Sequence, residues 1–321
     1  MSPRRGFRTL GSVSSRRTLV WVAVIVVALV VVDVLLVALA LTRTAPASNG
    51  NPGPVPTFSS APRSPSPTTA EPSDAVTTDP AATVAPVRRL LSAVDGQEAW
   101  RASSGVCDGT DGVLEHTVDG GRTWAPVGRG AGSGAVLALR AGTDGVSVVV
   151  GTGDDCEPAV RTSVDDGRSW KYEVAGAAGA GVGPDGLILS TGTVDSPCAD
   201  PIQAYEGTFT TAVVCADEVQ WRSGDGAWVG VPLVGARSLA DDGNSYLVAR
   251  VGAATCAGAE IRSMPATGVT PSTKSTVVGC AADADADEDP DAPLAIARAG
   301  EAVWLWTGAE VRTSSDGGAT W

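Results

Sequence analysis

Residues 117–124 of the chain read Thr-Val-Asp-Gly-Gly-Arg-Thr-Trp, and this motif returns further along. Near-complete copies stand at residues 163–170 and 314–321, and a shortened copy, Ser-Gly-Asp-Gly-Ala-Trp, stands at residues 223–228. An aspartate in a tight turn accepts hydrogen bonds from the backbone N–H groups that follow it, and glycine supplies the positive φ that such a turn needs. A motif repeated every few tens of residues therefore predicts a repeat architecture of sheets joined by tight turns.

The four segments resemble the Asp-box, or BNR, repeat of sialidase-like and sortilin-like β-propellers, and the resemblance covers residues 83–321. In that family the box lies on the turn between the last two strands of a blade, away from the ligand-binding face. The resemblance therefore implies a structural role for the box residues, with direct ligand contact as the alternative. The aspartate and tryptophan of the four copies are Asp119 and Trp124, Asp165 and Trp170, Asp225 and Trp228, and Asp316 and Trp321.

The spacing of the boxes predicts the number of blades. The box aspartates are 46 (119 to 165), 60 (165 to 225) and 91 (225 to 316) residues apart, and 91 is close to twice 46. A decayed copy is therefore expected near residue 267, where Thr267-Gly268 provides a turn. Turns that precede short apolar strands support five units, and they lie at residues 95–96, 144–145, 185–186, 242–243 and 300. The fold class predicted is all-β, a five-bladed propeller of four-stranded blades.

The two ends of this domain match each other. The segment Thr-Val-Ala-Pro-Val at residues 83–87 resembles the Thr-Trp-Ala-Pro-Val that completes the first box at residues 123–127. The early segment is therefore expected to supply the final strand of the last blade. Such closure would leave no exposed sheet edge in the ring.

A membrane anchor is expected before the propeller. Residues 19–41 contain one ionisable group, Asp33, and a helix of this length spans the hydrocarbon core of a bilayer. Arginines cluster before the span, which places the N-terminus in the cytoplasm and the rest of the chain outside, anchored in the plasma membrane by a single pass. Asp33 is a tolerated polar residue or a functional contact. The alternative to an anchor is a signal peptide cleaved after Ala45-Pro46-Ala47.

The predicted domains follow from these observations. They are a cytoplasmic basic tail (1–17), a transmembrane signal-anchor helix (18–42), a disordered linker rich in Pro, Ser, Thr and Ala (43–82) and the propeller ectodomain (83–321). The linker has almost no large apolar residues and therefore cannot bury a core.

Six cysteines, all beyond the span, fit an oxidising compartment. They allow 15 sets of three disulfides. Cys198 and Cys215 bracket an apparent insertion in the long 60-residue repeat, which favours pairing them. Cys256 with Cys280, and Cys107 with Cys156, follow by elimination. The same insertion, with its aromatic residues Tyr205 and Phe209, is the candidate binding loop.

The charge balance excludes some partners. Without the five arginines of the tail and Asp33, the totals of 23 Lys+Arg and 36 Asp+Glu become 18 and 35, a net charge of −17. Nucleic acid and anionic lipid are therefore poor ligands for the ectodomain. The acidic run at residues 283–291 favours a solvated, mobile loop between blades, with weak Ca²⁺ binding as the alternative, because the glycine and glutamate of a calcium loop are missing. No motif for another cofactor or metal is present.

A basic residue recurs just before each box or its decayed copy. Neighbouring acids and box tryptophans offer partners for these side chains, and the alternative is a ring of positive charge around the propeller. The residues are His116, Arg161, Arg222, Arg262 and Arg312.

Catalysis is the weaker functional hypothesis. Sialidases need an arginine triad, an Arg-Ile-Pro element and a Tyr-Glu pair, but here Arg88-Arg89 runs into Leu90-Leu91. None of the three tyrosines, Tyr172, Tyr205 and Tyr246, stands in that family context. The sequence therefore predicts a protein- or glycan-binding or assembly module at the cell surface, with a sialidase-like glycoside hydrolase as the alternative.

Overall fold

The computed structural model describes residues 87–321 except 108, 129–133, 174–177 and 283–291. The described residues all belong to one compact unit, Thr78–Trp321. The predicted tail, anchor, linker and acidic run lie outside the described residues. Within the described part of the chain, no helix is long and apolar enough to cross a membrane.

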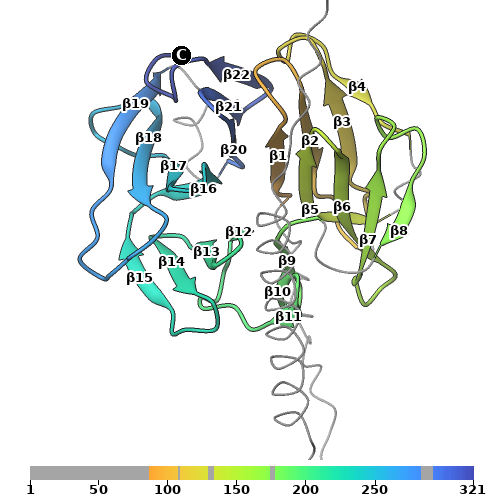
Figure 1. The fold of residues 1–321 in the computed structure, drawn as a ribbon, viewed down its shortest axis with the longest axis horizontal. Helices are drawn as coiled ribbons and strands as arrows, with labels where there is room; N and C mark the ends of the chain where they lie inside the picture. The colour runs from red at the N-terminus through yellow and green to blue at the C-terminus, as the bar shows by residue number, and fades with distance from the viewer. Residues whose placement is uncertain (1–86, 108, 129–133, 174–177, 283–291) are drawn as a thin grey trace, which may run out of the picture. The chain divides into compact units, whose positions relative to one another are not determined.

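The described residues form six antiparallel sheets around a common axis, which is the architecture of a six-bladed β-propeller (Figure 1). Each innermost strand contacts the innermost strand of the next sheet, and the last sheet contacts the first. In chain order the sheets are β1 (Arg89–Ala93), β2 (Ala99–Ser103), β3 (Val113–Thr117), β4 (Ala125–Pro126); β5 (Ala135–Gly142), β6 (Gly145–Thr152), β7 (Glu157–Ser163), β8 (Lys171–Glu173); β9 (Gly181–Gly183), β10 (Gly186–Leu189), β11 (Gly192–Val194); β12 (Gln203–Glu206), β13 (Thr210–Val214), β14 (Glu218–Ser223), β15 (Val229–Pro232); β16 (Ala236–Asp241), β17 (Ser245–Arg250), β18 (Gly258–Pro265), β19 (Thr276–Ala282); and β20 (Ala295–Ala299), β21 (Ala302–Thr307), β22 (Glu310–Ser314).

The prediction of five blades is wrong, because the 60-residue interval between Asp165 and Asp225 holds more than one repeat. Asp165 follows the third strand of the second sheet, and Asp225 follows the third strand of the fourth. The whole third sheet lies between them, built from strands of only three or four residues. The first turn of the fourth sheet, around Gly207, has no Asp-Gly pair and therefore escaped the count. The decayed repeat expected near Thr267 does exist, as the turn between β18 and β19.

Three turns, which we call the box turns (residues 117–124, 163–170 and 314–321), share one hydrogen-bond pattern. Thr117 Oγ1 donates to Asp119 Oδ1 at 2.9 Å, and Thr123 donates to the same carboxylate from its backbone N and its hydroxyl at 2.9 and 2.6 Å. The Trp124 indole donates to Gly121 O at 3.1 Å, and Gly121 has a φ of 82°. The carboxylate thus accepts hydrogen bonds from donors, such as the Thr123 N–H, that have no backbone acceptor in a tight turn.

The two faces of the ring are stabilised differently. The box turns lie beside the first turn of their own sheets, since Gly120 N donates to Gln97 O and Gly317 N to Glu301 O, both at 2.9 Å. We call this face the box face. The three disulfides lie at the opposite ends of the strands, in the pairing favoured by the sequence: Cys107–Cys156, Cys198–Cys215 and Cys256–Cys280.

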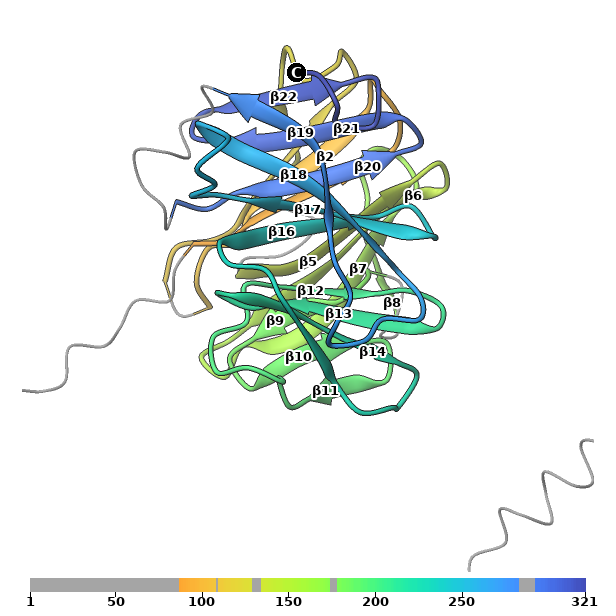
Figure 2. The same cartoon turned by 90° about the vertical axis from the view of Figure 1, so that its left-hand side faces the viewer.

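The first and last sheets meet through aromatic packing. Trp304 on β21 is fully buried, its indole donates to Asp95 O at 2.8 Å, and its ring meets the edge of Trp124 with centroids 6.4 Å apart. Arg89 and Arg101 lie over the Trp306 ring at 4.7 and 5.0 Å. This seam between the first and last sheets is visible from the side in Figure 2, where β2 lies behind β20 and β21.

The expected closing strand is tested only in part. Residues 83–86 lie outside the described residues, and Val87 is 49% exposed. Arg89 and Leu90 belong to β1, where they pair with Ser103 and Ala102 of the first sheet rather than with the last one.

Candidate functional site

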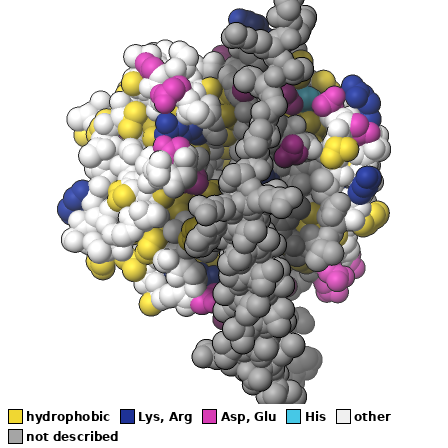
Figure 3. All heavy atoms as spheres, viewed as in Figure 1, with side chains coloured by type: hydrophobic (Ala, Val, Ile, Leu, Met, Phe, Trp, Pro, Cys, Tyr) yellow, Lys and Arg dark blue, Asp and Glu magenta, His cyan; other side chains and the backbone are white. Residues whose placement is uncertain are grey.

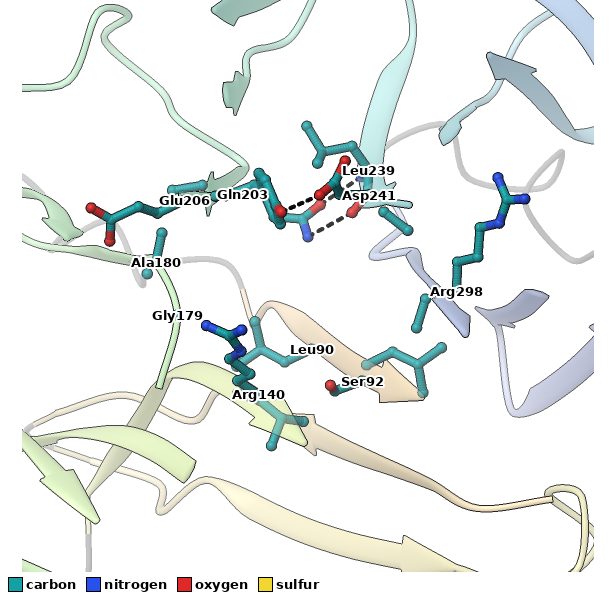
Figure 4. A pocket seen from close by; sticks show the side chains of 18 of the residues that line it. Leu90, Ser92, Arg140, Gly179, Ala180, Gln203, Glu206, Leu239, Asp241 and Arg298 are labelled. Carbon is teal, nitrogen blue, oxygen red and sulfur yellow. Dashed lines mark hydrogen bonds between the residues drawn. The ribbon is translucent and has the colours of Figure 1, made fainter. Parts of the chain in front are cut away.

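A cavity of about 770 Å³ lies along the axis of the ring. Its walls come from the innermost strands of all six sheets, β1, β5, β9, β12, β16 and β20. The exposed turn residues Thr208, Phe209 and Thr267 also line it, so the cavity opens on the box face. We call it the axial pocket, and Figure 4 shows it from close by.

The axial pocket has apolar walls and a polar mouth. The walls include Leu137, Leu239 and Ile296, which are buried side chains of the strand interiors. The mouth is formed where the innermost strands end, and one polar residue comes from each of five sheets. These residues are Ser92, Arg140, Glu206, Asp241 and Arg298.

Two of the polar groups in the pocket are held by hydrogen bonds within the protein. The Gln203 amide accepts from Ser238 Oγ at 2.9 Å and from Leu239 N at 2.7 Å, and it donates to Leu239 O at 3.1 Å. The Glu206 carboxylate accepts from Ser190 N at 2.6 Å and from Ser190 Oγ at 2.7 Å. Both side chains are therefore fixed in position before any ligand binds.

Tyr205 is a neutral donor in this site. Its hydroxyl donates to Asp241 Oδ2, and its ring meets the edge of Tyr246 with centroids 5.6 Å apart. Burial raises the pKa of Tyr205, and the hydrogen bond to Asp241 raises it further. Asp241 Oδ1 is inaccessible to solvent and has no hydrogen-bond partner among the described residues. A tyrosine that keeps its proton in this way is suited to positioning rather than to nucleophilic attack.

The three arginines of the pocket differ in what they contact. Arg88 Nη1 donates to Val182 O at 2.8 Å. Arg298 Nη1 lies 2.8 Å from Asp242 Oδ2, and its Nε donates to Gly300 O at 2.7 Å. Arg140 is exposed and forms no hydrogen bond or ion pair with any other residue that the structure describes. The mouth therefore presents one guanidinium whose donors remain unused.

The residues that we predicted as a binding loop lie in this pocket, but they do not form a projecting loop. Residues 203–214 form β12 and β13, the first hairpin of the fourth sheet. Tyr205 and Phe209 both line the axial pocket, and Phe209 is 77% exposed at its rim. The disulfide between Cys198 and Cys215 joins the connection before β12 to the end of β13.

The basic residues that precede the boxes pair or stack individually. His116 Nε2 lies 3.0 Å from Glu98 and its ring stacks on Trp100. Arg161 and Arg222 lie over Tyr172 and Trp228 at 3.5 and 4.5 Å. Arg262 contacts buried Glu260 at 3.0 Å, and Arg312 donates to Ala282 O at 2.6 Å. On the face shown in Figure 3, charged side chains of both signs are scattered rather than gathered in one patch.

The box residues do not reach the pocket. Asp119, Asp165 and Asp316 accept hydrogen bonds within their own turns, and these bonds lower the pKa of each carboxyl to about 2. Trp124, Trp170 and Trp321 each donate to the backbone of the same turn. In the described part of the chain, no group of three or more His, Cys, Asp or Glu side chains is arranged to hold a metal ion.

Comparison with known proteins gives distant likenesses only. No protein-family model and no curated protein matches the chain. Among solved structures, the β-propeller domain of the Trilobed protease from Pyrococcus furiosus is 9% identical, with a TM-score of 0.35, and the match covers 70% of this chain and 82% of that one. A GH74 xyloglucanase from Xanthomonas campestris (13% identical, TM-score 0.24) and a puromycin-hydrolyzing peptidase from Mycobacterium tuberculosis (16%, 0.25) are each matched over 71% of this chain, but over only 37% and 38% of their own length.

Proposed function

We propose that this protein is a membrane-anchored, extracytoplasmic propeller that binds a segment of another cell-surface protein in the axial pocket. The observation that carries the proposal is the state of the polar groups at the mouth. Glu206, Gln203 and Arg298 are already hydrogen-bonded within the protein, whereas Arg140 is not. The pocket therefore offers one unused charged donor next to an apolar wall.

This combination fits a peptide better than a glycan. A sugar presents a hydroxyl on almost every carbon, and each hydroxyl that is buried without a partner costs free energy. A site for a glycan consequently needs many polar groups that are free to bind it. A peptide side chain instead buries apolar area against residues such as Leu137, Leu239 and Ile296, which gains about 25 cal/mol for each Å² removed from water.

The hydrolase alternative rests on one observation, the contact between Tyr205 and Asp241 beside Glu206. A tyrosine nucleophile must lose its proton during the reaction, but here burial and Asp241 raise the pKa of Tyr205. Glu206 accepts from both donors of Ser190. Of the three arginines of the pocket, Arg88 donates to Val182 O and Arg298 pairs with Asp242, so the three do not form a set of free guanidinium groups. These contacts favour binding over glycoside hydrolysis.

The topology is part of the same proposal. The anchor at residues 18–42 holds the chain in the plasma membrane, the tail 1–17 remains in the cytoplasm, and the linker 43–82 carries the propeller outside. Three disulfides fit an oxidising compartment. Within this proposal the box turns are structural members of the Asp-box class.

Cross-linking on intact cells tests the function. Thr208→Trp adds a bulky side chain at the mouth, and Thr143→Trp adds the same side chain to the equivalent turn of the second sheet, outside the pocket. We expect Thr208→Trp to lose a protease-sensitive cross-linked species that Thr143→Trp retains. If both folded variants keep the same partners as the wild type, the pocket is not the binding site. If Thr208→Trp instead loses a cross-linked species that contains carbohydrate, the result would support the glycan alternative.

A further inference from the structure

The axial pocket contains a donor that points to the chemistry of its ligand. Resting on the function proposed above, we infer that Arg140 binds a carboxylate of the protein segment that enters the pocket, and that an apolar side chain next to this carboxylate packs on the pocket wall. The carboxylate belongs either to the C-terminus of the segment or to an Asp or Glu side chain.

Arg140 stands at the end of β5, where its side chain enters the mouth from the second sheet (Figure 4). The stem of the side chain lies against Gly179, where an added Cβ would be 3.8 Å from Arg140 Cβ. Figure 4 shows Glu206 across the mouth from Arg140, and no ion pair joins them. The positive charge of Arg140 is therefore not paired with either of the two acids that line the pocket, Glu206 and Asp241.

Ser92 supplies a second donor for an anion. Its Oγ accepts a hydrogen bond from Ala141 N at 2.8 Å, which leaves the hydroxyl proton free to donate. Figure 4 shows this hydroxyl on the same side of the cavity as Arg140. A carboxylate can accept from a guanidinium and a hydroxyl together, and hydrogen bonds between charged groups are the stronger ones.

Not every arginine of the pocket is paired with a carboxylate. The pocket is lined by three arginines and two acids, although the ectodomain as a whole is strongly acidic. One of the acids, Asp241, accepts from Tyr205, and one of the arginines, Arg298, is paired with Asp242. Arg88 and Arg140 have no carboxylate partner among the described residues, and Arg88 donates to Val182 O, so Arg140 is the uncommitted donor that a bound carboxylate would meet.

Peptide selection on the whole ectodomain tests the inference. Wild-type protein and the Arg140→Gln, Arg140→Lys, Arg168→Gln and Thr208→Trp variants are used to select from two random heptapeptide libraries, one ending in a free C-terminus and one displayed internally. Arg168 is the matched control because it lies in a box turn, is 75% exposed and does not line the pocket. Enriched peptides are then synthesised as acids and as the corresponding amides, and their affinities are measured by calorimetry.

We expect peptides with a carboxylate next to an apolar residue to be enriched by the wild type and by Arg168→Gln. Arg140→Gln should lower the affinity for these peptides about tenfold or more, while the affinity for the amide analogues stays unchanged. Arg140→Lys should restore part of the lost affinity. Enrichment in the first library alone identifies a C-terminal carboxylate, and enrichment in the second identifies a side chain.

Two results would overturn the inference, and they differ in their consequence for the proposed function. If the enriched peptides lack a carboxylate, or bind Arg140→Gln and wild type equally, the role of Arg140 fails while peptide binding stands. If neither library yields a peptide that prefers wild type over Thr208→Trp, both the inference and the proposed function fail.

Discussion

Removing the Trp304 side chain should open the ring at the seam between its first and last sheets. Trp304 is fully buried, donates to Asp95 O at 2.8 Å and meets the edge of Trp124. Truncating a buried aromatic to alanine costs about 3–5 kcal/mol, and the lost hydrogen bond contributes about 1 kcal/mol of this. Since domains are stable by about 5–15 kcal/mol, Trp304→Ala leaves a marginal fold.

Urea unfolding measures this loss. With a slope of about 2–3 kcal/mol/M, a loss of about 4 kcal/mol lowers the midpoint by about 1.5–2 M. Amide hydrogen exchange shows where in the fold the stability is lost. Protection should fall first in β1, β2 and β20–β22, because these strands meet at the seam.

Trp221→Ala is the matched control. Trp221 is 7% exposed, lies on β14 and donates to Ala266 O at 3.1 Å, so it joins the fourth and fifth sheets in the same manner. We expect a similar loss of stability, but with exchange faster in β12–β19. A loss below about 1 kcal/mol for Trp304→Ala, or the same exchange pattern for both variants, would refute the seam as we describe it.

Two further predictions concern stability. The folded pKa of Asp119 is about 2, below its ordinary 3.8, so the stabilisation by its hydrogen bonds is complete above pH 4 and is lost as the pH falls through 2. The gap in melting temperature between wild type and Asp119→Ala should therefore close from pH 4 to pH 2, and a gap that does not depend on pH would contradict the assigned hydrogen bonds. Glu260→Gln leaves Arg250 and Arg262 without the buried carboxylate that they contact at 3.1 and 3.0 Å, and it should cost about 3–5 kcal/mol in urea unfolding. Glu310→Gln, which removes an exposed partner of Arg312, should cost about 0–1 kcal/mol, and equal losses for the two variants would show that burial of Glu260 does not matter.

The box turns could be predicted from the sequence because their physics is local. A serine or threonine, an aspartate, a glycine and a tryptophan within eight residues make all of the hydrogen bonds that define the turn. The number of blades could not be read in the same way. The third sheet was counted from its turn at residues 185–186, but the only box between Asp165 and Asp316, at Asp225, belongs to the fourth sheet, so the two sheets were taken for one repeat. Gly207 turns the first hairpin of the fourth sheet without an aspartate before it, and this sheet therefore gave no turn signal of its own.

The axial pocket was not predicted for a different reason. Its polar residues come from five sheets and meet only when the ring closes, so no spacing in the sequence joins them. A weak signal exists: Ser92, Arg140 and Arg298 each stand a few residues before the glycine of a predicted first turn. Tyr205 and Phe209 were singled out for their aromatic rings, but an apparent insertion suggested a projecting loop where the structure has an ordinary hairpin.

The proposed function requires that a protein segment binds at the mouth of the axial pocket. Photo-cross-linking from single positions on intact cells tests it most directly, with a benzophenone amino acid at Thr208 on the mouth, Thr143 on the box face outside the pocket, or Val234 on the opposite face, where it is 65% exposed. We expect a cross-linked protein from position 208 and none from positions 143 and 234. A partner captured from position 234 but not from position 208 would contradict it.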